Sequence, residues 1–144
     1  MIYLLLGTNM GDRDSNIANA RRLLTERLNV VLQESPVIET QAIGFDGEDF
    51  LNQVVVFDKN ITPIELLDIC QGIEIDMGRE EHIAEYDNCG NRVYSSRIID
   101  IDILLIDSVV LESERLTIPH PQVETRPFVK ELLNYLKYDT RRVI

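Results

Sequence analysis

The chain has 144 residues, of which 44% are hydrophobic and 27% charged, and it is long enough for one domain with a buried core, residues 1–144. Its formal net charge of −11 repels the phosphates of nucleic acid, and no apolar run reaches the ~18 residues of a membrane span. We therefore expect a cytoplasmic protein that binds neither nucleic acid nor a membrane. We expect it to be a monomer.

The first half of the chain predicts a strand, a helix and three more strand segments. Ile2–Leu6 is a continuous apolar run that ends at Gly7, which is typical of a central strand buried on both faces. Apolar residues then recur at helical spacing over 17–28, after an acidic cap at Asp12 or Asp14. The other strands of this half are predicted at 30–33, 37–40 and 50–57.

The second half begins with a clear helix signal. Residues 62–65, Thr-Pro-Ile-Glu, combine a capping box with a proline at the first helical position, and Gly78 is placed to end that helix. Residues 97–106 form the clearest strand pattern of the chain. The segment 107–111 predicts a hairpin turn followed by a returning strand, and a last helix is predicted from about Pro127.

This order of elements is strand, helix, strand, strand, helix, strand. It favours an α+β fold of the ferredoxin-like sandwich type, in which an antiparallel sheet carries its helices on one face. A C-terminal hairpin and helix follow this unit. The second face of the sheet is then expected to be free to carry a functional site.

The sharpest chemical signal is the pair Asp100 and Asp102 in the strand at 97–106. Alternation puts both aspartates on one face, roughly 6 to 7 Å apart at their backbones. The opposite face receives four apolar residues, Ile99, Ile101, Ile103 and Leu105. A divalent cation relieves the repulsion between two such carboxylates, and carboxylate and phosphate oxygens are the usual ligands of Mg²⁺. The spacing alone leaves open that the aspartates only solvate the outer face of the strand.

Further segments resemble an enzyme family when they are taken in chain order. They are Gly7-Thr8-Asn9, the loop 40–47, Asp49-Phe50-Leu51-Asn52, the helix end with Gln71, Glu74, Gly78 and Arg79, and the segment from Leu116 through His120-Pro121 to Arg126-Pro127-Phe128. With the strand at 97–105, they resemble 6-hydroxymethyl-7,8-dihydropterin pyrophosphokinase, a family of folate biosynthesis, from Ile2 to about Leu133. The resemblance implies a ferredoxin-like fold and the transfer of pyrophosphate from ATP to the pterin hydroxymethyl group, leaving AMP.

The resemblance also implies roles for single residues. Asp100 and Asp102 would bind two magnesium ions that bridge the ATP phosphates, and Arg79 and Arg97 would assist the transfer. The residues implied for the pterin pocket are Thr40, Ile43 and Asn52, with the ring stacked between Phe50 and Phe128. The residues implied for the ATP side are Gln71, Glu74, Arg97, Arg115, Thr117, His120 and Arg126. These residue types suit a flat heteroaromatic ring and a transfer that depends on positioning and charge stabilisation.

The segment 80–96 departs from the family pattern. Relatives usually carry a second basic residue soon after the Arg79 position and a Trp-Gly-Pro run before Arg97, where this chain has Glu81 and Tyr94-Ser95-Ser96. Arg92 and Tyr94 are candidates to replace those groups. A long polar segment without a period predicts a lid that closes over two substrates, and an insertion without function is the alternative.

Taken one at a time, the residues allow simpler interpretations. Single phenylalanines at positions 50 and 128 are more often core residues, His120 is able to cap a turn, and Glu74 suits a helix surface. Three other functions therefore stay open beside the pyrophosphokinase. They are a different magnesium-dependent nucleotide transferase, a pterin- or nucleotide-binding module without catalysis, and an acidic interaction protein.

Overall fold

The central strand of the protein is β1 (Ile2–Thr8), as its apolar run predicts. In the computed structural model it pairs with β4 (Phe50–Phe57) on one side and with β5 (Asp100–Ile106) on the other, both antiparallel. Two short strands, β2 (Gln33–Glu34) and β3 (Ile38–Thr40), pair with the outer edge of β4. The structure describes residues 1–41, 48–78 and 98–136.

Every residue of β1 is buried, because the strand has neighbours on both edges and packed layers on both faces. The strand is longer than predicted. It continues through Gly7 and Thr8, since Gly7 pairs with both Asn52 and Asp100, and Thr8 pairs with Leu51. The end of β1 therefore lies beside the first residues of β4 and β5, where the polar side chains of the sheet are concentrated.

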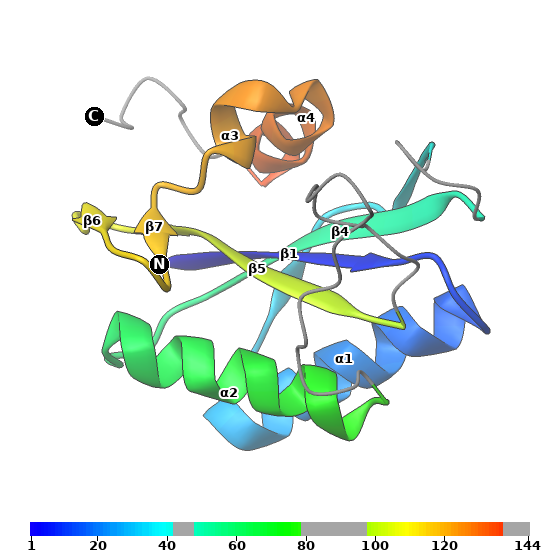
Figure 1. Ribbon diagram of the computed structural model, residues 1–144, viewed down its shortest axis with the longest axis horizontal. Coiled ribbons are helices and arrows are strands. Elements are labelled where there is room, and N and C mark those ends of the chain that lie inside the picture. Colours follow the sequence, from blue (N-terminus) through cyan, green and yellow to red (C-terminus); the bar gives the residue numbers. More distant parts are fainter. Residues whose placement is uncertain (42–47, 79–97, 137–144) are drawn as a thin grey trace, which may run out of the picture.

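Helices α1 (Arg13–Leu28) and α2 (Pro63–Asp76) cover one face of the sheet (Figure 1). Both begin at predicted caps: Asp12 accepts the N–H of Ser15 at 3.1 Å, and Thr62 and Glu65 form the capping box. Apolar residues of both helices pack on the apolar side of β1, β4 and β5 and form the helix-side core. No helix in the described ranges combines the length and apolar character needed to cross a bilayer.

The opposite face of the sheet, here called the second face, carries α3 (Gln122–Thr125) and α4 (Pro127–Tyr135) (Figure 1). The second core lies there. Its residues are Tyr3, Leu5, Val54, Val56, Leu104, Leu105, Val123, Val129, Leu132 and Leu133. The second face is therefore only partly free, which corrects the prediction that helices leave it open. The antiparallel sheet with α1 and α2 on one face is the predicted α+β, ferredoxin-like arrangement.

The pairing of β1 with β5 is irregular near the middle of both strands. Tyr3 pairs with Leu105 and Leu4 pairs with Ile103, so Leu104 is an extra residue on β5, as in a β-bulge. Ile99, Ile101 and Ile103 enter the helix-side core as predicted, but Leu104 and Leu105 both belong to the second core. The prediction for Leu105 is wrong because the bulge reverses the alternation of side chains beyond it.

The predicted hairpin after β5 is also wrong in its pairing. A turn does form, since Val109 donates its N–H to the carbonyl of Ile106 at 3.0 Å and Ser108 has a φ of 64°. The strand after this turn, β6 (Leu111–Glu112), pairs with β7 (Thr117–Ile118) rather than with β5. This separate hairpin leads into the segment before α3.

Candidate active site

Gly7, Asn52 and Asp100 form a row across the sheet, because Gly7 pairs with the other two on either side. Directly paired residues of antiparallel strands point to the same face. Leu5, two residues before Gly7, lies in the second core and pairs with Asp102. The side chains of Asn52, Asp100 and Asp102 therefore share the second face, beside the part that α4 covers.

Thr40, Phe50 and Asn52 come together at the end of β3 and the start of β4. Asn52 is 4% exposed, and its amide Nδ2 donates to Thr40 Oγ1 at 2.8 Å. A Cβ atom built on Gly7 would lie 3.5 Å from Asn52 Oδ1 and 3.8 Å from the Cδ1 atom of Phe50. Because Gly7 has no side chain, it adds nothing to the surface between this cluster and Asp100.

The Gly7-Thr8-Asn9 motif fixes the approach to this cluster. Asn9 is buried, and its Nδ2 donates to the carbonyl of Glu48 at 3.1 Å. Arg13 of α1 donates to the carbonyl of Asp49 at 2.7 Å. The two residues before Phe50 are thus bound to the end of β1 and the start of α1, so the motif helps to position, through the backbone, the residues predicted for the pterin pocket.

Phe128 lies in the first turn of α4 and packs against the second core while staying partly exposed. The guanidinium of Arg126, the residue that precedes α4, lies 5.7 Å from the centre of the Phe128 ring. Phe50 comes from the sheet and Phe128 from the helix that packs on the second face. Both predicted stacking residues thus belong to the same side of the molecule.

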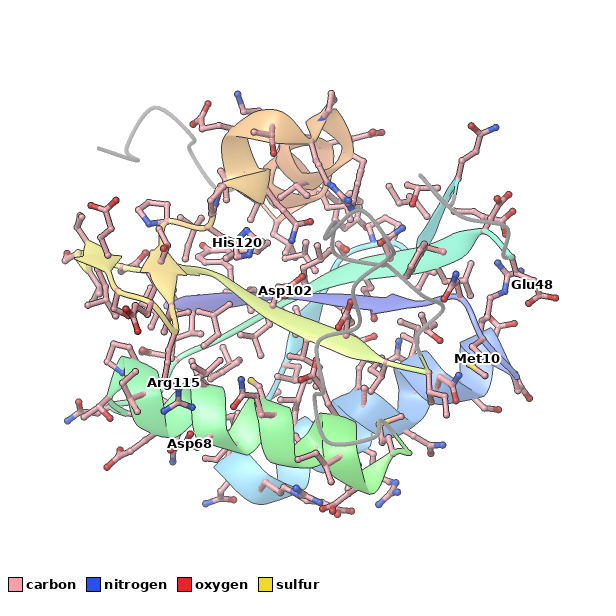
Figure 2. All side chains as sticks on the ribbon, viewed as in Figure 1. Met10, Glu48, Asp68, Asp102, Arg115 and His120 are labelled. Atoms are coloured by element: carbon pink, nitrogen blue, oxygen red, sulfur yellow. The ribbon has the colours of Figure 1, made fainter. Side chains whose placement is uncertain are left out.

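Asp102 lies on β5 beneath the segment that enters α3, with His120 on the α3 side (Figure 2). Its Oδ2 atom accepts a hydrogen bond from Gln122 Nε2 at 3.0 Å. Burial raises the pKa of the Asp102 carboxyl, and the neighbouring charge of Asp100 raises it further, whereas His120, Gln122 and Arg126 oppose the shift. The described surroundings therefore disfavour the ionised form of Asp102, and a nearby divalent cation with oxygen ligands would favour it.

Two hydrogen bonds fix the backbone and the ring of His120. Its backbone N–H donates to the carbonyl of Leu104 at 2.8 Å, and its Nδ1 atom accepts the N–H of Gln122 at 3.1 Å. Because Nδ1 accepts, the proton of the neutral ring is on Nε2, which is then a donor. Such a donor suits an oxygen of phosphate or ribose.

Arg115 contacts Gln71 of α2 on the opposite side of β5 from His120. Arg115 comes from the turn between β6 and β7 and donates to Asp68 at 2.8 Å and to Gln71 at 3.3 Å, and Figure 2 shows it above Asp68. Thr117, on β7, is partly exposed. The predicted ATP-side residues thus lie on both sides of β5, which is an outer strand of the sheet as described.

Glu74 is buried between α2 and β5, so the interpretation as a plain surface residue is wrong. It is 6% exposed, and its Oε2 atom accepts the N–H of Ile101 at 2.9 Å. Ile101 lies between Asp100 and Asp102. Glu74 therefore binds the backbone that carries both aspartates.

Several predicted residues lie outside the described residues. They are Ile43, Arg79, Glu81, Arg92, Tyr94 and Arg97. Within the described ranges, no group of three or more His, Cys, Asp or Glu side chains could hold a metal ion. The carboxylates of Asp100 and Asp102 would accordingly share a cation with oxygens from another source, such as a bound phosphate. Sequence reasoning missed Gln122, since a glutamine in a one-turn helix has no pattern of its own.

Comparison with known proteins identifies the family to which the chain belongs. A sequence model of the family described as 7,8-dihydro-6-hydroxymethylpterin-pyrophosphokinase matches residues 3–137. The chain belongs to this family. Membership gives it pyrophosphokinase activity on the hydroxymethyldihydropterin substrate, with ATP as co-substrate, in folate biosynthesis.

Individual relatives support the assignment. The chain is 41% identical over 133 residues to 2-amino-4-hydroxy-6-hydroxymethyldihydropteridine pyrophosphokinase of Porphyromonas gingivalis, which covers 90% of this chain and 86% of the relative. The Bacillus subtilis protein of the same name is 34% identical over 129 residues, covering 88% and 72%. The folic acid synthesis protein fol1 of Schizosaccharomyces pombe is 38% identical over 139 residues, covering 95% of this chain and 18% of that protein.

Proposed function

We propose that the chain is a single pyrophosphokinase domain, residues 1–144, in which magnesium held by Asp100 and Asp102 supports the transfer of pyrophosphate from ATP to the pterin hydroxymethyl group. The main observation in support of this proposal is the row of Asn52, Gly7 and Asp100 across β4, β1 and β5. It joins the cluster suited to a pterin to the carboxylates suited to a metal on one face. Substrates bound at the two ends of this row would meet above Gly7.

The pterin end of the row offers an amide, a hydroxyl and aromatic rings. Asn52 and Thr40 are already hydrogen-bonded to each other, so the amide of Asn52 is fixed in direction before a ligand arrives. A heteroaromatic ring with polar edges suits a slot with two aromatic faces and few aimed polar groups. We assign the two faces to Phe50 and Phe128, and the resemblance adds Ile43.

The metal end of the row fits Mg²⁺ by the chemistry of its donors. Asp100 and Asp102 supply only carboxylate oxygens, and burial raises the pKa of Asp102, so that a nearby cation would favour its ionised form. When bound, magnesium ions would neutralise and bridge the phosphate oxygens of ATP. Two ions are the proposed number.

The remaining polar residues would orient ATP. His120 presents its Nε2 donor from the α3 side, and Arg115, next to Gln71, presents a guanidinium from the α2 side. Arg126 and Thr117 complete this proposed set, and Arg79 and Arg97 are proposed to assist the transfer. These local cations attract phosphate although the chain carries a formal net charge of −11, because close charges outweigh distant ones.

The proposed reaction balances without a covalent enzyme intermediate. The hydroxymethyl oxygen of the pterin forms a bond to the β-phosphorus of ATP, and the bond from that phosphorus to the oxygen bridging to the α-phosphorus breaks. The β- and γ-phosphates leave together on the pterin, AMP is released with the bridging oxygen, and the proton of the hydroxymethyl group goes to solvent. The protein's own part is to position the two substrates and stabilise charge.

Product analysis tests the proposal. The purified chain is mixed with ATP, magnesium and 6-hydroxymethyl-7,8-dihydropterin, and AMP and ADP are followed by chromatography. We expect AMP to rise in step with pterin pyrophosphate, and only when magnesium is present. Formation of ADP would favour a different nucleotide transferase, and tight binding of both substrates without turnover would favour a binding module. The lid at 80–96, the monomeric state and the cytoplasmic location stay predictions.

A further inference from the structure

We propose that Gln122 is a positioning residue that holds the carboxylate of Asp102 in its metal-binding orientation. The inference rests on the proposed function, in which Asp102 is a metal ligand. Three groups of Gln122 are engaged at once: its side-chain amide donates to Asp102, its backbone N–H donates to His120, and its carbonyl accepts the N–H of Arg126. One residue thus contacts two side chains, those of Asp102 and His120, and the backbone of Arg126, all three residues being assigned to the metal or to ATP.

The hydrogen bond to Asp102 restricts the rotation of that carboxylate. An ionised carboxylate only accepts hydrogen bonds, and Gln122 Nε2 donates to its Oδ2 atom at 3.0 Å. Rotation about the last bond of an aspartate is otherwise soft, so a fixed donor at one oxygen decides where the other oxygen points. Outer-shell partners of this kind orient metal ligands, and their loss typically weakens metal binding by about 10- to 100-fold.

The contacts of Gln122 divide cleanly between its side chain and its main chain. The bond to His120 Nδ1, at 3.1 Å, and the bond from Arg126, at 3.0 Å, both use the backbone of Gln122. The side chain alone reaches Asp102. A substitution at this position therefore removes the contact with Asp102 and leaves the backbone contacts with His120 and Arg126 in place.

Gln122→Met is the sharpest test, because methionine has a similar length and no amide donor. Mn²⁺ replaces Mg²⁺, and free Mn²⁺ is measured by electron paramagnetic resonance in the presence of α,β-methylene-ATP, which prevents turnover. We expect the Mn²⁺ dissociation constant to rise at least about tenfold. The magnesium concentration for half-maximal rate should rise in parallel.

Thr125→Ala is the matched control, since Thr125 lies on the same short helix and its hydroxyl contacts only the backbone carbonyl of Pro121 among the bonds described. A second readout is the imidazole proton resonance of His120, which is simple to assign because His82 is the only other histidine in the chain. We expect Thr125→Ala to bind Mn²⁺ like the wild type, and the His120 resonance to stay unchanged in Gln122→Met.

Unchanged Mn²⁺ affinity in a folded Gln122→Met protein would overturn the proposal. A shifted His120 resonance, or equal loss of affinity in Thr125→Ala, would also overturn it, because the effect would then come from α3 as a whole. A different result would show that the proposed function itself is wrong. In that case Asp102→Asn binds Mn²⁺ with ATP analogue as the wild type does, whatever happens at Gln122.

Discussion

The residues described around Asp102 stabilise its charge less well than water does. Its pKa is raised first by burial and second by the charge of Asp100. A carboxyl with a raised pKa in the folded state costs stability when it is ionised. That cost is absent at a pH below the unfolded value, where the group is protonated in both states, and it grows as the pH rises through the folded pKa.

We predict that Asp102→Asn is more stable than the wild type at pH 7 without magnesium and ATP, although it loses turnover. The expected rise in Tm is about 2 to 4 °C, which corresponds to roughly 1 kcal/mol for a domain of this size. Thermal unfolding measured from pH 3 to pH 7 should show the difference shrinking at the acidic end.

Asp58→Asn serves as the control for this prediction. Asp58 is 86% exposed and lies 3.7 Å from the N-terminal amine, so its removal should change Tm little. A lower Tm for Asp102→Asn than for the wild type at pH 7 would contradict the argument, because the ionised carboxylate would then be stabilising the empty site.

The residue types of the site were predictable from the sequence, but their contacts were not. Two aspartates at a strand spacing indicate a shared face, and they have one. By contrast, Glu74 looks like any carboxylate on a helix until α2 is packed on β5, when its Oε2 atom accepts the N–H of Ile101. Gln122 is likewise recognisable only when the segment before α4 lies over Asp102, because hydrogen bonds between distant segments have no local pattern.

At the scale of elements, most strands and helices followed from local signals, although the strand predicted at 30–33 forms at Gln33–Glu34. The capping box at Thr62 and the run at 50–57 both hold as predicted. The errors arose where a partner strand decides the outcome. The bulge in β5 depends on its pairing with β1, and β6 pairs with β7 rather than with β5. Alternation within one segment cannot reveal either of these.

The contact between α2 and β5 gives a prediction at this scale. Glu74→Ala leaves the N–H of Ile101 without its acceptor in a buried place, which should lower the free energy of unfolding by about 1 to 3 kcal/mol. Glu74→Gln keeps an oxygen acceptor at the same position and should lose less. Urea unfolding of both variants measures the difference. Equal losses would show that the charge of Glu74 matters rather than its hydrogen bond.

At the scale of the whole molecule, the sheet separates two cores and shares its second face between packing and chemistry. The helix-side core is the larger one, formed by α1, α2 and the strands, and α4 closes the second core next to the site. Cys70 lies in the helix-side core with no exposed surface. Burial raises the pKa of its thiol to about 12, with smaller contributions from the charges of Glu74 and Asp102.

We predict that Cys70 is protected from thiol reagents in the folded protein, with Cys89→Ser used to remove the second cysteine. At pH 8 its reaction with a disulfide reagent should be at least about 100-fold slower than in urea, because little thiolate forms and no surface is exposed. Prompt reaction of the folded chain would contradict the burial.

The same raised pKa makes a signed prediction for alkaline pH. The unfolded thiol ionises near its ordinary value of about 8.5, whereas the folded thiol stays neutral until about 12. The contribution of Cys70 to stability is thus complete below about pH 8.5 and declines as the pH rises toward 12. The urea concentration at the midpoint of unfolding, measured between pH 7 and pH 10, should fall less in Cys70→Ala than in the protein that retains Cys70.

The irregular pairing of β5 with β1 has a consequence for insertions and deletions. Over the paired stretch, β5 has one residue more than β1. Deleting Ile103 or Leu104 would leave a regular strand in which both aspartates keep the second face, since alternation is then unbroken to the end of β5. Deleting Ile101 would make Asp100 and Asp102 adjacent, so that one of the two would point into the helix-side core. The bulge is therefore the place where β5 can lose a residue while Asp100 and Asp102 stay together on the second face.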